Sequence, residues 1–254
     1  MKIAEGKVET KTANGIATVT FFHPQSNSLP GTLLRALAAE IEAAGKDDAA
    51  KVIVLKSEGE KAFCAGASFD ELLSIKTAEE GKVFFSGFAA VINAIRKAPK
   101  FVLARVQGKA VGGGVGLACA ADYTLAHEGA SVKLSELAIG IGPFVVGPAV
   151  ERKLGTSGFT TLTLNATEWQ TAQWAREHGM YAGIFSSVSD LDKAVQALAE
   201  RLASSNPEAM AMLKKILWQG TDEWDRLLLH RAELSGQLVL SDFTREAIAR
   251  FKAK

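Results

Sequence analysis

The amino-acid sequence predicts an α/β protein in which alternating strands and helices are followed by a helical C-terminal part. Two observations support this fold class. Continuous apolar runs, as in strands buried on both faces, occur at residues 52–55 and 101–106, and helical patterns follow both of them. From residue 146 onward the helical pattern dominates. The 254 residues provide ample length for a buried core, as one large domain or two small ones.

The chain begins with a predicted β-hairpin over residues 8–22, because Asn14-Gly15 stands between alternating β-forming residues. A loop at residues 24–30 and an amphipathic helix at 32–44 follow it. The later elements expected before residue 146 are a helix at 85–95, a helix at 113–121 and short strands at 123–126 and 132–134.

The part after residue 146 is expected to consist of helices. Pro207 follows Asn206 and suits the first turn of one of them. The expected ranges are 146–154, 158–164, 171–178, 191–205, 207–218 and 223–251, the last one either continuous or interrupted near Ser241.

The composition excludes several classes of function. The 29 basic and 28 acidic residues give a formal net charge of +1, which argues against a dedicated nucleic-acid binder. Cys64 and Cys119 belong to no CxxC pair or Cys/His cluster, so no metal site is predicted. The first residues contain no apolar signal segment, and the longest apolar stretch, 110–121, is too short and glycine-rich to span a bilayer. We therefore expect a cytoplasmic protein that binds neither nucleic acid nor membrane.

Two glycine-containing segments are candidates for a functional site. Residues 61–70 read KAFCAGASFD and residues 106–116 read VQGKAVGGGVG, and the second leads into a helix. Unpaired N–H groups at a helix start, with glycines that allow close approach, can hold a phosphate or a developing oxyanion.

Neither segment fits a known phosphate or hydrolase motif. In GxGxxG the third glycine is replaced by Leu117, no P-loop GK[ST] follows, and Asp70 stands where a GxSxG elbow needs its last glycine. Tight packing of a helix on a strand would also explain the three consecutive glycines at 112–114.

Together, the segments are far more specific. AFCAGASFDEL at residues 62–72, VQGKAVGGG at 106–114 and Asp122 after the Ala-rich helix resemble the crotonase superfamily, the enoyl-CoA hydratase/isomerase group. The resemblance covers nearly the whole chain and extends to His23-Pro24 and Arg250-Phe251. It implies a ββα spiral core with an oxyanion hole in residues 1–195 and a helical trimerisation region in residues 196–254.

The resemblance also implies the roles of individual residues. In that family, the backbone N–H groups at the positions of Ala67 and Gly113 stabilise a thioester enolate, and losing one such donor costs roughly 3 kcal/mol. No separate cofactor is implied, because coenzyme A is part of the substrate, and a homotrimer or hexamer is expected. The residues implied to contact the substrate or coenzyme A are Asn27, Ser28, Leu29, Ala65, Gly66, Ser68, Phe69, Gly112, Phe251 and Lys254.

The acid/base residues depart from the hydratase pattern. Hydratases of the family carry two glutamates, whereas here Gly116 occupies the first position and Glu136 the second. Two carboxylates suit the addition of water, while a single one can remove a proton from one carbon and return it to another. The resemblance therefore implies a Δ3,Δ2-enoyl-CoA isomerase, and Pro143-Phe144 favours the same interpretation. Without the resemblance, Glu136 would be interpreted as an ordinary cap or a solvated loop residue.

Three alternatives remain open. The first is hydration or dehydration of a branched or carboxylated enoyl thioester. The second is decarboxylation, in which Lys133 or His230 would bind the carboxylate of the substrate. The third is an inactive oligomer that only binds acyl-CoA. Lys133 and Ser135 can equally be surface residues of a strand edge, and Cys64 is assigned no chemistry.

Overall fold

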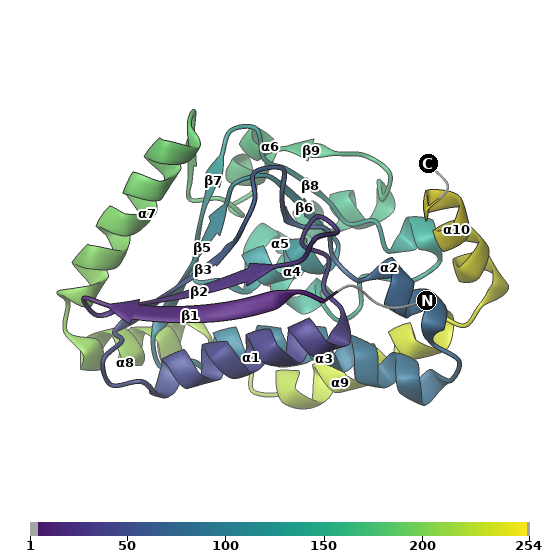
Figure 1. Ribbon diagram of the computed structural model, residues 1–254, viewed down its shortest axis with the longest axis horizontal. Helices are drawn as coiled ribbons and strands as arrows, with labels where there is room; N and C mark the ends of the chain where they lie inside the picture. The colour runs from purple at the N-terminus through teal and green to yellow at the C-terminus, as the bar shows by residue number, and fades with distance from the viewer. Residues whose placement is uncertain (1–4, 253–254) are drawn as a thin grey trace.

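The computed structural model describes residues 5–252, which form two β-sheets surrounded by helices (Figure 1). The larger sheet has the strand order β1-β2-β3-β5-β7-β10 and the smaller one β4-β6-β8-β9. The strands of the larger sheet are β1 (Lys7–Ala13), β2 (Ile16–Phe22), β3 (Val52–Ser57), β5 (Phe101–Val106), β7 (Tyr123–His127) and β10 (Gly183–Phe185). Those of the smaller sheet are β4 (Ala62–Cys64), β6 (Lys109–Val111), β8 (Ser131–Lys133) and β9 (Gln170–Thr171).

The predicted N-terminal hairpin is confirmed. Strands β1 and β2 pair antiparallel, and Asn14 and Gly15 both have positive φ, 51° and 79°, as a tight hairpin turn requires. From β2 onward the larger sheet is parallel, since β3, β5, β7 and β10 follow through crossover connections. The predicted α/β class is therefore confirmed.

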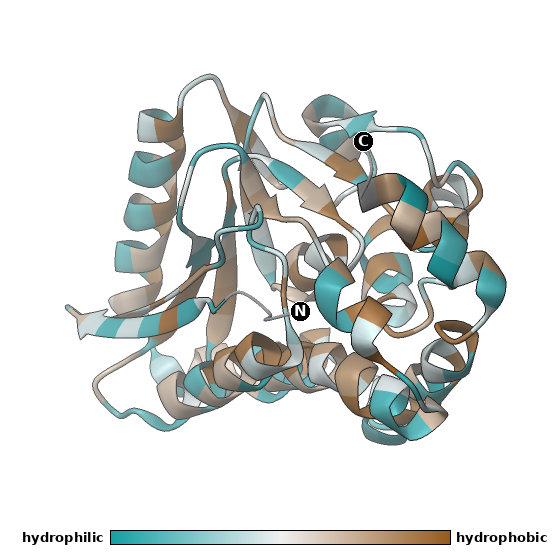
Figure 2. Cartoon of the chain, turned by 45° about the vertical axis from the view of Figure 1, so that its right-hand side comes forward, coloured by the Kyte–Doolittle hydropathy of each residue, from teal (hydrophilic) through white to brown (hydrophobic). Residues whose placement is uncertain are grey.

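Helices cover both faces of the larger sheet. Helix α1 (Gly31–Lys46) lies against β1, β2 and β3, and α3 (Ala78–Lys97) packs on α1. Helix α7 (Val188–Ala203) covers the other face, with hydrophobic residues toward the sheet and hydrophilic residues outward (Figure 2). The sequence-based boundary at residues 195/196 falls inside α7, which packs on the sheet along its whole length.

The remaining helices lie beside the smaller sheet, against α3 and β5, and at the C-terminal end of the chain. They are α2 (Phe69–Ser74), α4 (Gly113–Ala120), the 3₁₀ turn η1 (Leu137–Ile139), α5 (Gly147–Leu164), α6 (Ala172–Glu177), α8 (Pro207–Leu217), α9 (Trp224–Leu238) and α10 (Asp242–Lys252). Gly155, with φ of 70°, kinks α5 between the two helices expected there. The chain breaks between α9 and α10 near Ser241, one of the two predicted alternatives.

Helices α3 and α9 cross at two glycines. A Cβ atom on Gly81 would lie 2.6 Å from the Cα of Gly236, closer than any real contact. The two backbones therefore touch directly, and α9 is held against α3 at the position next to Ser235. The C-terminal α10 then lies against α2 and η1 (Figure 1).

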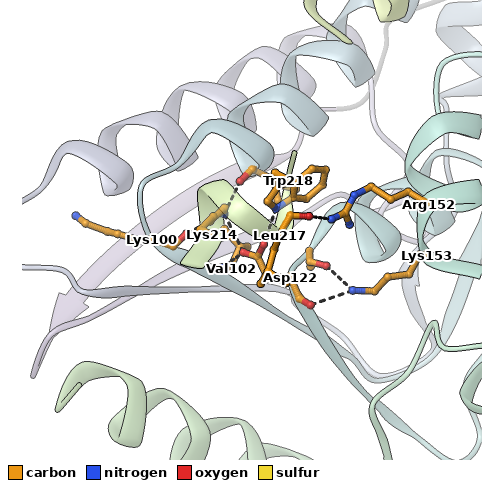
Figure 3. Close-up of polar contacts among 10 residues, drawn as sticks. Lys100, Val102, Asp122, Arg152, Lys153, Lys214, Leu217 and Trp218 are labelled. Carbon is orange, nitrogen blue, oxygen red and sulfur yellow. Dashed lines mark hydrogen bonds and ion pairs between the residues drawn. The ribbon is translucent and has the colours of Figure 1, made fainter. Parts of the chain in front are cut away.

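A buried polar cluster anchors the C-terminal end of α4 (Figure 3). Lys214 of α8 places its Nζ 2.8 Å from Oδ2 of Asp122, and the indole Nε1 of Trp218 donates to Oδ1 at 2.7 Å. The N–H of Val102 also donates to Oδ2 at 2.7 Å, and Lys153 of α5 donates to the carbonyl of Asp122 at 2.9 Å. These bonds tie α4, α5, α8 and β5 together, so the helix that starts at the glycine cluster is fixed at its far end.

Across the described part of the chain, residues 5–252, no helix combines the length and the apolarity needed to cross a lipid bilayer.

Candidate active site

The two glycine-containing segments of the sequence meet in space. Gly66 has φ of 84°, and a Cβ atom on it would lie 2.8 Å from the carbonyl oxygen of Val111 and 3.4 Å from the backbone nitrogen of Gly113. Only glycine tolerates this conformation at such a close approach. The loop after β4 therefore lies directly beside the start of α4.

Backbone pairing leaves one N–H of this loop available. Leu29 donates to the carbonyl of Gly66 at 2.7 Å, and Ser68 donates to the carbonyl of Leu29 at 3.3 Å, in a parallel bridge opposite Ala67. The N–H of Ala67 lies between these two bonds and donates to no backbone carbonyl within residues 5–252. Gly113 is the first residue of α4, so its N–H has no intrahelical acceptor.

Ala67 and Gly113 border the same pocket, whose volume is about 50 Å³. Its walls are mostly apolar, and Glu136 is the one ionisable side chain among the described residues that line it. The lining residues come from the loop after β4, α2, α3, the start of α4, the segment around η1, and α9: Ala65, Gly66, Ala67, Phe69, Leu72, Phe85, Phe88, Gly112, Gly113, Ser135, Glu136, Ile139, Ile141, Gly142, Pro143, Phe144, Val145, Val146 and Ser235.

The carboxylate of Glu136 is buried without a charged partner. Its Oε2 is enclosed and makes no hydrogen bond within the described residues 5–252. Oε1 lies 2.9 Å from where a Cβ of Gly112 would be, so the carboxylate faces the turn that begins α4. Burial raises the pKa of Glu136 from 4.5 to about 7, although its own backbone N–H, by hydrogen bonding, acts in the opposite direction. A carboxyl group of this pKa can both take and return a proton near neutral pH.

Of the predicted coenzyme A contacts, Ala65, Gly66, Phe69 and Gly112 line the pocket. The others within the described residues lie outside its lining. Phe251 of α10 lies with its ring centroid 6.4 Å from that of Phe69, and Lys254 falls outside the described residues.

Asn27, Ser28, Leu29 and Ser68 support the loop that carries Ala67, and their contacts with coenzyme A stay a prediction. The side chain of Asn27 accepts from the N–H of His23 at 2.9 Å and donates to the carbonyl of Ala62 at 2.9 Å. The hydroxyl of Ser28 lies 3.0 Å from Nδ1 of His23. Ser68 is the N-cap of α2, which explains its complete burial.

Gly116, at the position of the first glutamate of the hydratase pattern, has no room for a side chain. A Cβ on Gly116 would lie 2.4 Å from Cγ1 and 2.7 Å from Cβ of Val146. Because the side chain of valine is short and stiff, no side chain fits at residue 116 unless this part of the pocket wall moves.

The residues considered for binding a substrate carboxylate lie apart from the pocket. Lys133 places its Nζ 4.4 Å from the ring centroid of Trp169, and His230 lines a separate surface depression on α9. Ser135 does line the pocket. Cys64 is fully buried, and burial raises the pKa of its thiol to about 12, in line with the absence of an assigned role.

Several pocket residues were not singled out from the sequence. Phe85 and Phe88 belong to a predicted helix, but the periodicity does not indicate which of its buried residues border a cavity. Ser235 comes from α9, far along the chain, and no motif marks it. Val146 was assigned to the start of a helix, and its contact with Gly116 depends on tertiary packing.

The ββα spiral and the pocket between the two glycine segments define a protein of the crotonase class. The sequence profile of the enoyl-CoA hydratase/isomerase family matches residues 11–254, so the chain belongs to this family, as the resemblance predicted. It is therefore an acyl-CoA enzyme of the hydratase/isomerase type.

The relatives of this chain are named for different activities. A "Probable enoyl-CoA hydratase" of Bacillus subtilis (strain 168) is 27% identical over 94% of this chain and 93% of its own length. The peroxisomal Delta(3,5)-Delta(2,4)-dienoyl-CoA isomerase of Arabidopsis thaliana is 28% identical over 78% of this chain and 75% of its own. The crystal structure of an enoyl-CoA hydratase from Bacillus halodurans superposes with a TM-score of 0.87 over 96% of this chain and 99% of that one, at 22% identity. That last likeness concerns the fold.

Proposed function

We propose that this protein is a Δ3,Δ2-enoyl-CoA isomerase in which Glu136 is the acid/base residue and the N–H groups of Ala67 and Gly113 form the oxyanion hole. The observation that carries the proposal is the solitary carboxylate. Within residues 5–252, the pocket lining offers Glu136 as its one group able to move a proton.

The reaction follows from one base and two fixed donors. The carboxylate of Glu136 removes a proton from C2 of the 3-enoyl thioester, so the C2–H bond breaks and an O–H bond forms. The electron pair spreads over C2, C3, C4 and the thioester oxygen, which accepts hydrogen bonds from Ala67 and Gly113. The same proton then passes from Glu136 to C4, and the double bond lies between C2 and C3. Backbone donors suit this task because they are oriented before the reaction.

The packing at residue 116 supports isomerisation over hydration. A hydratase of this family uses two carboxylates to hold and activate water, and Val146 fills the place of the first. The apolar lining also disfavours a bound nucleophilic water, because water in a cavity needs two to four polar partners.

The decisive experiment follows the conversion of a 3-enoyl-CoA to the conjugated 2-enoyl-CoA by its ultraviolet absorbance. Glu136→Gln is expected to lower kcat/KM by roughly 10²- to 10⁴-fold, the usual contribution of a general base. Because the base must be ionised, wild-type kcat/KM should rise with pH and level off above about pH 7, following the pKa of Glu136. Glu128→Gln, the same change at an exposed glutamate outside the pocket, serves as the matched control and should retain full activity.

Three results would overturn this proposal. Unchanged turnover in Glu136→Gln would remove the residue from the mechanism. Formation of a 3-hydroxyacyl product from crotonyl-CoA in ¹⁸O-labelled water would establish hydration instead. Absence of turnover with every enoyl-CoA, together with tight binding of acyl-CoA, would favour an inactive binding protein.

We also propose that the protein is a homotrimer or hexamer of the cytoplasm, assembled through its C-terminal helices. Helix α8 directs Lys214 inward, while Met212, Leu213 and Ile216 on its other side are 65%, 52% and 57% exposed. Such an apolar face is typical of subunit contacts. Ile216→Glu is expected to yield smaller species in sedimentation velocity, whereas an unchanged mass would exclude α8 as the interface.

A further inference from the structure

We propose that the pocket selects a short, uncharged acyl chain of about four carbons, and that Val146 and Phe144 set this limit. The inference rests on the proposed function for the placement of the thioester, with its oxygen at Ala67 and Gly113. It adds the size and charge of the acyl group that this pocket accepts.

The volume of the pocket limits the length of the chain. The space is about 50 Å³, whereas a cavity of about 150 Å³ holds the six carbons of benzene. By this measure, the pocket encloses roughly two carbon atoms. With C1 and C2 at the mouth beside the two N–H groups, C3 and C4 fill the interior.

Two wall residues of the pocket, Phe88 and Val146, pack tightly against α4. At the start of the helix, the ring of Phe88 lies so close to Gly113 that a Cβ there would be 2.1 Å from Cε1. Three residues further on, Val146 covers Gly116 in the same manner. Since a helix rises 1.5 Å per residue, these two contacts lie only about 4.5 Å apart along α4.

The aromatic walls are held in place by their neighbours. On α3, Phe84 contacts Phe85 and Phe88 edge to face, with centroid distances of 5.2 and 6.1 Å. On the opposite side, the ring of Phe144 folds over Gly142, where a Cβ would lie 2.3 Å from Cζ. A longer chain therefore meets packed side chains rather than free space.

The same pocket disfavours a charged acyl group. No Lys, Arg or His belongs to its lining among the described residues, and Glu136 is already a buried acid. A second carboxylate would be desolvated beside it without a counter-charge, which is costly for both groups. This argues against the carboxylated enoyl thioesters considered from the sequence, both as hydration and as decarboxylation substrates.

The test measures the binding of saturated acyl-CoA thioesters by calorimetry, which does not depend on turnover. Butyryl-CoA, hexanoyl-CoA, decanoyl-CoA and glutaryl-CoA are compared with coenzyme A alone. Wild-type protein is expected to bind butyryl-CoA at least about tenfold more tightly than decanoyl-CoA or glutaryl-CoA. Equal or tighter binding of either larger thioester would overturn the inference.

Two variants identify the limiting residues. Val146→Ala and Phe144→Ala should each improve the binding of hexanoyl-CoA relative to butyryl-CoA by about tenfold or more. Val83→Ala, the same change at a residue that is 55% exposed on α3, is the matched control and should leave the ratio unchanged. If both pocket variants fold and keep the wild-type ratio, the assignment is wrong. A preserved preference for butyryl-CoA without isomerase activity would refute the proposed function alone.

Discussion

Glu136 and Asp122 are both buried carboxylates near α4, and their surroundings differ completely. Asp122 lies at the C-terminal end of the helix and is paired with Lys214, Trp218 and the N–H of Val102. Glu136 faces the N-terminal end across an apolar pocket, and its Oε2 has no partner within residues 5–252. The first carboxylate is neutralised by its neighbours, and the second remains free to react.

This contrast separates stability from chemistry. Burial of an unpaired charge costs free energy, so such groups are found mainly at functional sites. A carboxylate such as Asp122 is held in one position by its ion pair with Lys214 and its hydrogen bonds. The two ends of α4 therefore differ: the Asp122 end is fixed by its bonds, and the Glu136 end presents the unpaired carboxylate that we propose as the acid/base residue.

The largest expected effect on stability comes from removing the paired carboxylate of Asp122. Asp122→Ala leaves Lys214 buried without its counter-charge and should lower the free energy of unfolding by about 3–5 kcal/mol. Urea denaturation followed by circular dichroism measures this loss. Asp225→Ala is the control, since that carboxylate is about half exposed although it also pairs with a cation, and its loss should be far smaller. A similar loss in the two variants would show that the Asp122 cluster has no special structural role.

At Glu136, by contrast, removal of the carboxylate is expected to raise the free energy of unfolding. The folded protein holds the proton of Glu136 up to about pH 7, whereas the unfolded chain releases it near 4.5, so stability falls as the pH rises between these values. Glu136→Gln removes this penalty and should stabilise the protein by about 3 kcal/mol at pH 8. Thermal melts of both proteins at pH 8 and near pH 4.5 measure the difference.

The gain in Glu136→Gln should nearly vanish near pH 4.5, where the folded wild type carries the proton and the unfolded chain carries it about half of the time. A gain that is equal at the two pH values would indicate a packing effect instead of a titration effect. No gain at pH 8 would mean that the carboxylate is solvated and the contrast with Asp122 is wrong.

A smaller effect tests whether the pocket has room for a second acid. Gly116→Ala places a methyl group against Val146 and should destabilise the protein by about 1–2 kcal/mol, because overpacking exceeds the gain in helix propensity. The double variant Gly116→Ala, Val146→Ala should recover most of the loss. Chemical denaturation of the three variants gives the coupling, and additive losses would contradict the proposed contact.

The smallest effect concerns a charge whose partner is an aromatic ring. The Nζ atoms of Lys133 and Lys109 lie 4.4 and 5.0 Å from the ring centroid of Trp169, and burial together with Lys109 lowers the pKa of Lys133. Trp169→Ala should cost about 1 kcal/mol of stability without changing turnover. Trp169→Phe should retain part of this energy, and a loss of isomerase activity in a folded Trp169→Ala variant would place Lys133 in the mechanism.

The features that the sequence predicts well are those with local signals. The hairpin at Asn14-Gly15 and the buried strand at 101–106 appear where expected, because turn chemistry and apolar runs are local properties. Strands β4, β6 and β8 were only partly anticipated. Each has three residues, too few for a pattern to be recognised.

The candidate site likewise combines features that the sequence predicts with features that it does not. The glycine segments and Glu136 follow from a recognisable motif, and the structure brings them to one pocket. The apolar walls could not be predicted, since the contacts of Phe88 with Gly113 and of Val146 with Gly116 join segments distant in the chain. The supporting role of Asn27 was also hidden, because two of its partners, the carbonyls of Glu58 and Ala62, are distant in the chain.

The direct backbone contact between Gly81 and Gly236 also bears on the dimensions of the acyl site. Because no side chain separates the two helices, their backbones are in van der Waals contact. Ser235 of α9 therefore reaches the pocket. Even one methyl group at either glycine would push α9 away from α3 and widen the pocket. The size of this pocket is thus governed partly by two residues that do not line it.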